Sequence, residues 1–287
     1  NWVNLVLFLI SVLFFSSFAF GLDKSRYIPV DEVKAGTDAY CLTVLSGSEI
    51  EKFPLKVISV VRNHTPGRDA ILVMGTDETF KHIGPVQGCS GSPVYIDNRL
   101  AGALAAGWSF SKDPLYVVTP IKDMLRVGSV VEKTNGFSKS DLSSLRVEFE
   151  KQIDLSAVNE KISSSIRKSR DAGSGFKTLP CPVVTSLPGD VCKSLEDEFS
   201  GAGLVPLAGG GTGGEDIDTE YKPGGVLAIP LVSGDISMAA IGTVTEVDGD
   251  KVYGFGHNFL GTGSTDLPMA GGIVHTVVST MNFSFKL

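Results

Sequence analysis

The most informative stretch of this sequence is Gly88-Cys89-Ser90-Gly91-Ser92-Pro93, which we call the serine box. An apolar segment leads into it, and the apolar run Val94-Tyr95-Ile96 follows it. Glycines on both sides of Ser90 permit a tight turn that exposes the serine hydroxyl, and they leave room for a substrate carbonyl. The six residues by themselves are equally typical of a plain Gly/Ser/Pro turn between two strands. The rest of the chain has to decide between a nucleophilic serine and a turn.

The composition is that of a globular protein, because 43% of the 287 residues are hydrophobic and 20% are charged. The 33 glycines favour a turn-rich β architecture over a helical bundle, and the length allows one or two domains. The formal net charge is −7 and the sequence contains no basic run. We therefore expect no nucleic-acid partner and no attraction to an anionic membrane surface.

The beginning of the chain has the pattern of a targeting segment. Residues 5–20 are nearly all apolar, end near Ala19-Phe20-Gly21, and are followed by polar residues. This pattern predicts residues 1–21 as a secretory signal peptide cut near Gly21, with an uncleaved N-terminal membrane anchor as the alternative. The first residue is not Met and the last residues resemble the middle of a strand, so we also expect a fragment that is open at both ends.

Short apolar runs broken by turns predict a β-rich part over residues 22–131. Asp97-Asn98 predicts a tight reversal soon after the serine box, so the candidate serine leads directly into a hairpin. The predicted strands are residues 41–45, 55–61, 70–74, 94–96, 100–104 and 115–121.

The remaining chain divides into a connector and a second β-rich part. Apolar residues recur at four-residue spacing within residues 132–176, which predicts one or two amphipathic helices. Residues 177–287 are a second β-rich part, with a helix at 190–199 and a hairpin around Asp248-Gly249-Asp250. That hairpin delivers Gly256-His257 at the end of a strand, which is a suitable place for a general base.

Cysteines and histidines give no sign of a metal site. Cys181 and Cys192 flank a short polar segment and are placed to form a disulfide after export, whereas Cys41 and Cys89 are expected to be free thiols. The glycine-rich residues 209–214 lack the Lys-Ser/Thr of a phosphate-binding loop and predict a flexible loop. The histidines lack metal-ligand spacing, so we expect no metal and no cofactor; they are His64, His82, His257 and His275.

Attack by a serine on a carbonyl requires a nearby base and two donors for the developing oxyanion. His257 is the candidate base. The candidate donors are the backbone N–H groups of Ser90 and of Gly88, two residues before it. Ser92 is a rival nucleophile, but it stands at the start of the following strand and ranks behind Ser90.

Several separated segments resemble one known family. Residues 87–96 together with Leu100-Ala101-Gly102-Ala103-Leu104 are similar to the signature of the SpoIVB (stage IV sporulation protein B) peptidases, the S55 serine peptidases. The resemblance covers nearly all of the exported portion and is weakest between Glu132 and Lys177. The other similar segments are residues 66–73, 118–121, 241–257, 266–269 and 274–278.

The resemblance implies a mainly β, trypsin-like double β-barrel serine peptidase with a helical connecting insert. It implies an exported bacterial endopeptidase that cleaves an envelope or secreted protein by Ser/His/Asp acyl-enzyme chemistry. Ser90 is then the nucleophile and His257 the base, while the N–H groups of Gly88 and Ser90 hold the oxyanion. The serine block precedes the histidine block here, in the opposite order to the sporulation protein. The triad depends on geometry and not on chain order, so this order does not forbid catalysis.

The acid of the triad is a choice between two aspartates. Asp77 matches the family's catalytic aspartate best by position, and Asp69 is the alternative because it begins a strand of trypsin-like pattern. His275 is a lesser rival of His257 for the base. By analogy, residues 102–109 with Trp108 are expected to form the walls of a specificity pocket for an uncharged side chain.

A second reading comes from a different class of protein. The unresolved acid, together with Cys89 at a position where the family usually has Met, also fits a cell-envelope binding or scaffold protein that keeps the peptidase fold without turnover. An esterase of the α/β-hydrolase type is disfavoured, because a strand and not a helix follows the serine.

Overall fold

The computed structural model describes residues 22–131, 177–201, 203–210, 220–259 and 265–287. They form a mainly β protein with two principal sheets and a small third sheet. The expected targeting segment and the expected helical connector both lie outside the described residues. Within these described ranges, no helix is both long enough and apolar enough to cross a membrane.

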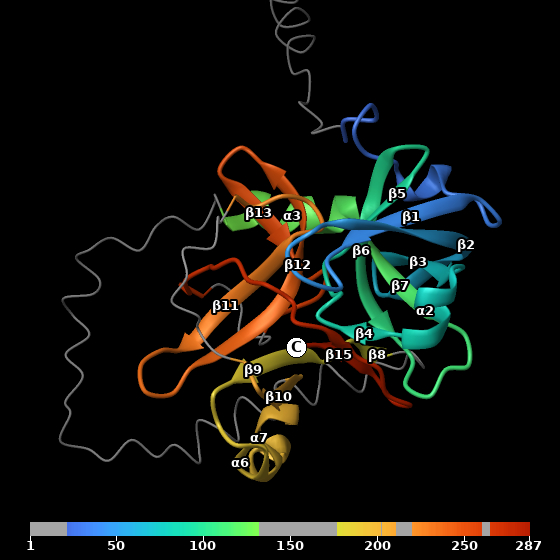
Figure 1. The fold of residues 1–287 in the computed structure, drawn as a ribbon. Helices are drawn as coiled ribbons and strands as arrows, with labels where there is room; N and C mark the ends of the chain where they lie inside the picture. Colours follow the sequence, from blue (N-terminus) through green and yellow to red (C-terminus); the bar gives the residue numbers. More distant parts are fainter. Residues whose placement is uncertain (1–21, 132–176, 202, 211–219, 260–264) are drawn as a thin grey trace, which may run out of the picture.

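The first sheet is a closed barrel that carries the serine box (Figure 1). Its strands lie in the order β5-β1-β2-β3-β7-β6-β8, and β5 also pairs with β6, which closes a ring of 6 strands. All of these pairings are antiparallel. The strands are β1 Asp38–Thr43, β2 Glu51–Thr65, β3 Arg68–Gly75, β5 Pro93–Ile96, β6 Arg99–Gly107, β7 Leu115–Pro120 and β8 Lys177–Thr178. The helices beside them are η1 Val30–Glu32, α2 Glu78–Ile83 and α3 Ile121–Val131.

Alternating side chains fill the barrel, because successive residues of a strand point to opposite faces. In β3, Ile71 and Val73 are completely buried in the main apolar core. Helix α2 adds Phe80, whose ring centroid lies 5.0 Å from that of Phe53 and 5.7 Å from that of Tyr116. This aromatic cluster anchors the segment that leads into the serine box.

The second sheet carries the histidine block. Its strands lie in the order β10-β9-β12-β11, and β13 pairs with β12 as the predicted hairpin. The β9–β10 pair is parallel, which requires a crossover, and two short helices supply it where the sequence predicts one longer helix. The elements are β9 Cys181–Thr185, α6 Gly189–Ser194, α7 Glu196–Gly201, β10 Leu204–Ala208, β11 Val226–Val232, β12 Met238–Asp248 and β13 Lys251–Gly254.

The C-terminal segment lies between the two principal sheets (Figure 1). Its strand β15 pairs in parallel with β4, the short strand that enters the serine box, and antiparallel with β14. Its Lys286 side chain contacts Thr43 of β1 and Thr243 of β12, so it touches both sheets. The three strands are β4 Val86–Gln87, β14 Val277–Val278 and β15 Ser284–Lys286.

The predicted fold class is confirmed, because a closed barrel beside another sheet is compatible with a double β-barrel protease.

The predicted disulfide is wrong, since Cys181 and Cys192 are both buried free thiols. Cys181 Sγ donates to Ile241 O at 3.5 Å, and Cys192 Sγ donates to Leu187 O at 3.7 Å. The two side chains therefore pack separately, and burial raises the pKa of the Cys181 thiol to about 12.

Candidate active site

The serine box is the turn between β4 and β5, and two glycines shape it. Gly88 has φ +93° and Gly91 has φ +97°, in the left-handed region that favours glycine. The N–H groups of Cys89 and Ser92 each donate to the carbonyl three residues earlier, which closes two consecutive tight turns. Ser90 therefore stands at the centre of a firmly bonded turn and is completely buried.

Gly91 lies so close to the second sheet that no side chain fits there. A Cβ on Gly91 would stand 2.0 Å from Thr243 O and 2.5 Å from Phe255 N. Ser90 O accepts from Thr243 N at 2.8 Å, and Thr245 Oγ1 donates to Gly91 O at 2.6 Å. The serine box is thus fixed against β12, the strand that leads into the histidine hairpin.

The histidine loop, residues 255–258, follows β13 and reaches the same place. Thr119 Oγ1 donates to Gly256 O at 2.7 Å and ties this loop to the barrel. A Cβ on Gly256 would stand 2.9 Å from Leu104 O, the carbonyl that accepts from Gly91 N at 2.7 Å. The histidine loop and the serine box therefore meet at one carbonyl of β6.

Four buried polar side-chain atoms in the described part of the chain lack a hydrogen-bond partner, and all four lie in or beside these two loops. They are Gln87 Oε1, Ser90 Oγ, Ser92 Oγ and His257 Nε2. An unsatisfied buried polar group costs about 1–3 kcal/mol, so such groups are rare in native proteins and need an explanation. Their concentration at one place makes the meeting point of the two loops the candidate site.

His257 has the hydrogen-bonding pattern of a base. Its Nδ1 lies 3.0 Å from Asn258 O, and because a carbonyl only accepts, Nδ1 carries the hydrogen and Nε2 keeps its lone pair. Burial lowers the pKa of His257 below its ordinary value, which keeps the ring neutral at pH 7. Nε2 and Ser90 Oγ make no hydrogen bond to each other here. Catalytic hydrogen bonds are often long or misaligned before substrate binds.

Two backbone donors of the serine box are left unused by the fold. The N–H groups of Cys89, Gly91 and Ser92 all donate to backbone carbonyls. Among the residues that the structure describes, those of Gly88 and Ser90 donate to none. These two are the donors that the sequence predicts for an oxyanion, so the local backbone leaves both available.

The two candidate acids are engaged elsewhere. Asp77 is the N-cap of α2 and accepts from the N–H three residues later at 2.9 Å. Asp69 accepts from Asn63 N at 3.0 Å and pairs with Arg62 at 2.7 Å, and these contacts lower the pKa of Asp69. In the described part of the chain, neither carboxylate hydrogen-bonds to His257.

Two further predicted residues lie outside the two loops, and one residue beside the serine box was not predicted. His275 is exposed in the C-terminal segment, where its N–H donates to a backbone carbonyl. Trp108, predicted to line a specificity pocket, packs against a small cluster of buried barrel residues. Gln87 was missed by sequence reasoning, and the one signal for it is its place directly before Gly88.

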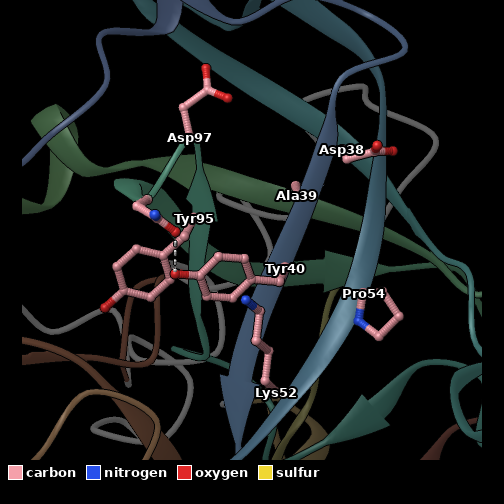
Figure 2. Close-up of a pocket in the computed structure, with 8 residues that line it drawn as sticks. Asp38, Ala39, Tyr40, Lys52, Pro54, Tyr95 and Asp97 are labelled. Carbon is pink, nitrogen blue, oxygen red and sulfur yellow. Dashed lines mark hydrogen bonds between the residues drawn. The ribbon is translucent and has the colours of Figure 1, made fainter.

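A surface pocket of the barrel does not involve the serine box or the histidine loop (Figure 2). The rings of Tyr40 and Tyr95 stack at 5.1 Å, and Lys52 Nζ lies 3.7 Å from the Tyr40 ring centroid. The hydroxyl of Tyr40 donates to Asn98 Oδ1 at 3.3 Å. These groups satisfy one another, and none of the four unpartnered buried atoms lines the pocket.

The serine box and the histidine loop meet where a closed barrel lies beside a second sheet, an arrangement compatible with a double β-barrel protease fold. The family model described as SpoIVB peptidase S55 matches residues 23–118, which is less than half of the chain. The match confirms the resemblance over those residues and supports a peptidase, a class whose substrates are proteins. It includes the serine box and ends before β12 and the histidine loop. No curated protein and no solved structure gives a significant match.

Proposed function

We propose that this protein is an exported serine endopeptidase of the SpoIVB type, which hydrolyses peptide bonds of an envelope or secreted protein. The observation that carries the proposal is the pair of unpartnered buried atoms, Ser90 Oγ and His257 Nε2, in two loops that meet at one carbonyl. The family match over the serine box supports the peptidase class. Export rests on the apolar residues 5–20.

In the acylation step, Ser90 Oγ attacks the scissile carbonyl while His257 Nε2 takes the hydroxyl proton. The negative charge that develops on the carbonyl oxygen is held by the N–H groups of Gly88 and Ser90. Removing one such donor from a serine hydrolase costs about 2.7–4 kcal/mol of transition-state stabilisation, so the backbone of the box matters as much as the hydroxyl. His257 then gives the proton to the leaving amine, and the same base activates the water that cleaves the acyl-enzyme.

The resemblance and the observed hydrogen bonds assign the orientation of the His257 ring to different groups. The resemblance implies Asp77, or Asp69 as the alternative, as the acid that orients the ring. In the structure, the carbonyl of Asn258 accepts from Nδ1 and takes that orienting role. Asp77 and Asp69 stay candidates for the acid that stabilises the imidazolium once substrate is bound.

The test of the proposal is a Ser90→Ala variant of the full chain, with Ser92→Ala as the matched control. Ser92 is a second buried, unpartnered serine in the same turn, so both substitutions remove the same atom from similar surroundings. We expect Ser90→Ala to abolish casein cleavage and labelling by a fluorophosphonate probe, and Ser92→Ala to remain labelled at Ser90. Casein cleavage by Ser90→Ala, or a label that maps to Ser92, would show that the nucleophile is assigned wrongly.

A binding or scaffold protein with the peptidase fold is the second candidate. Two observations favour it. Ser90 Oγ and His257 Nε2 make no hydrogen bond to each other, and Asp77 and Asp69 bond to groups other than His257. The fluorophosphonate probe discriminates between the two functions, because labelling requires an activated hydroxyl. A folded wild-type chain that takes up no label would support the scaffold.

A further inference from the structure

Lys286 is a buried lysine with no carboxylate partner in the described part of the chain. The residue is 1% exposed, and burial lowers the pKa of its amine. Its Nζ donates to Thr43 Oγ1 at 2.8 Å and to Thr243 Oγ1 at 3.3 Å. Lysine is almost never fully buried without a charged partner, because its ammonium group loses its hydration. Neither the acylation step nor the cleavage of the acyl-enzyme uses the Lys286 amine, so its burial needs another reason.

The Lys286 side chain lies against the backbone of the serine box. The stem of Lys286 packs on Gly88, where an added Cβ would stand 3.1 Å from Lys286 Cδ. Thr243 Oγ1, which accepts from the lysine, donates its own hydrogen to Gly88 O at 2.8 Å. The other lysine acceptor, Thr43 Oγ1, lies 3.8 Å from Cys89 Sγ. A single polar network thus runs from the lysine to the backbone of the box.

Thr243 fixes the peptide groups on both sides of the Ser90 N–H. Its hydroxyl holds the Gly88 carbonyl, and its own N–H holds the Ser90 carbonyl at 2.8 Å. Between these two pinned peptide groups lies the Cys89–Ser90 peptide, whose planar geometry sets the direction of the Ser90 N–H. Because Lys286 occupies a lone pair of Thr243 Oγ1, the hydroxyl hydrogen is directed to Gly88 O.

The strand that carries the lysine is itself tied to the entrance of the box. In β15, Ser284 pairs with Val86 and Phe285 pairs with Gln87 of β4. Ser284 Oγ also donates to the carbonyl of Ile83, at the end of α2. The C-terminal strand therefore holds Lys286 at a set distance from the residues that lead into the oxyanion donors.

We propose that Lys286 and Thr243 are positioning residues, which hold the Gly88 and Ser90 N–H groups in the geometry that receives an oxyanion. The proposal rests on the proposed serine-peptidase function and deepens it. Neither residue contacts the reacting atoms. Their effect is exerted through the backbone of the serine box, so it belongs to kcat and not to substrate affinity.

The experiment compares three variants of the full chain in peptide hydrolysis. We expect Thr243→Val and Lys286→Met to lower kcat by roughly 10- to 100-fold with KM unchanged, as for a small misplacement of catalytic groups. Thr243→Ser keeps the hydroxyl and should restore kcat. Retention of kcat by Thr243→Val would overturn the proposal, and the Val/Ser pair decides even if Lys286→Met does not fold.

Thr245→Val is the matched control. Thr245 is a buried threonine on the same strand, and its hydroxyl donates to Gly91 O, in a peptide group that does not adjoin the Cys89–Ser90 peptide. A purely structural role predicts equal losses of kcat for Thr243→Val and Thr245→Val, and that result would overturn the positioning role. We expect Thr245→Val to lose clearly less kcat than Thr243→Val.

Amide hydrogen exchange separates failure of this inference from failure of the proposed function. We expect the amides of residues 88–92 to exchange faster in Thr243→Val than in Thr245→Val, whether or not substrate is turned over. Unchanged exchange in an active enzyme overturns the positioning role alone. A wild-type chain that neither hydrolyses peptides nor takes up the fluorophosphonate label overturns the proposed function, and with it the role of these residues in oxyanion binding.

Discussion

Gly91→Ala tests whether the serine box and the second sheet touch as closely as the site requires. The added Cβ would stand 2.0 Å from Thr243 O, a backbone atom that cannot turn aside as a flexible side chain can. Gly36→Ala is the matched control, because Gly36 also has a left-handed φ, of +78°, but nothing lies within 4 Å of its added Cβ. The two substitutions therefore share the backbone strain and differ in the collision.

The magnitudes follow from those two contributions. A left-handed alanine costs about 1–2 kcal/mol relative to glycine, and the lower entropy of the unfolded chain returns about 0.4–1 kcal/mol. Both variants share this cost of backbone strain and this gain from the unfolded chain. Overpacking adds about 1–3 kcal/mol at Gly91 only. We therefore expect the free energy of unfolding to fall by about 1 kcal/mol in Gly36→Ala and by about 2–4 kcal/mol in Gly91→Ala.

The assay is denaturant unfolding of the full chain, followed by the rate of fluorophosphonate labelling at Ser90. Gly91→Ala should lose labelling even where it is folded, because the box can accept the methyl group only by moving away from β12 and the histidine loop. Gly36→Ala should label at the wild-type rate. If the two free energies of unfolding differ by less than about 0.5 kcal/mol, the close approach of the two loops is refuted.

Three further predictions concern protonation, thiols and the acid. Burial lowers the pKa of His257, so the acid limb of the kcat/KM profile should have its midpoint below pH 6.5. Thermal stability should fall as the pH drops below 6.5, because the unfolded chain then binds a proton that the folded chain does not. An acid limb with its midpoint above pH 6.5 would contradict this prediction. Because Cys181 and Cys192 are free, a reducing agent should leave the melting temperature unchanged, and mass spectrometry after alkylation of the unfolded, unreduced chain should find both thiols modified. Asp77→Asn should keep stability, because Asn caps a helix as well as Asp, and should lower kcat only slightly; a loss of about 10⁴-fold would instead identify Asp77 as the triad acid.

The barrel was predictable because its signals are local. The apolar runs at residues 55–61, 70–74, 94–96 and 100–104 all fall inside observed strands, since alternation and turn residues are written along each strand. The hairpin at 248–250 was found in the same way. Neither signal says which strands become neighbours, so the contact between the serine box and β12 could be expected only from the resemblance.

The end of the chain shows where local patterning misleads. In Phe283-Ser284-Phe285-Lys286, the alternation predicts phenylalanines inside and the serine and lysine in water. Phe283 is buried as the alternation predicts, but the structure also buries Ser284 and Lys286 almost completely and leaves Phe285 half-buried. The reason is long-range, because the acceptors for the two polar side chains come from α2, β1 and β12. No window of sequence around Lys286 contains those partners.

This burial bears on what the C-terminal strand does. A strand that served only to complete a sheet would be at least as stable with an apolar residue at position 286, because replacing buried charged groups by apolar side chains of similar volume is often neutral or stabilising. The fold instead keeps an amine that donates to two hydroxyls, one of which holds the carbonyl of Gly88. The family match ends at residue 118 and includes neither this amine nor His257. The proposed site therefore draws on three segments that are distant in the sequence, because the serine box contains the proposed nucleophile without its proposed base or its backbone support.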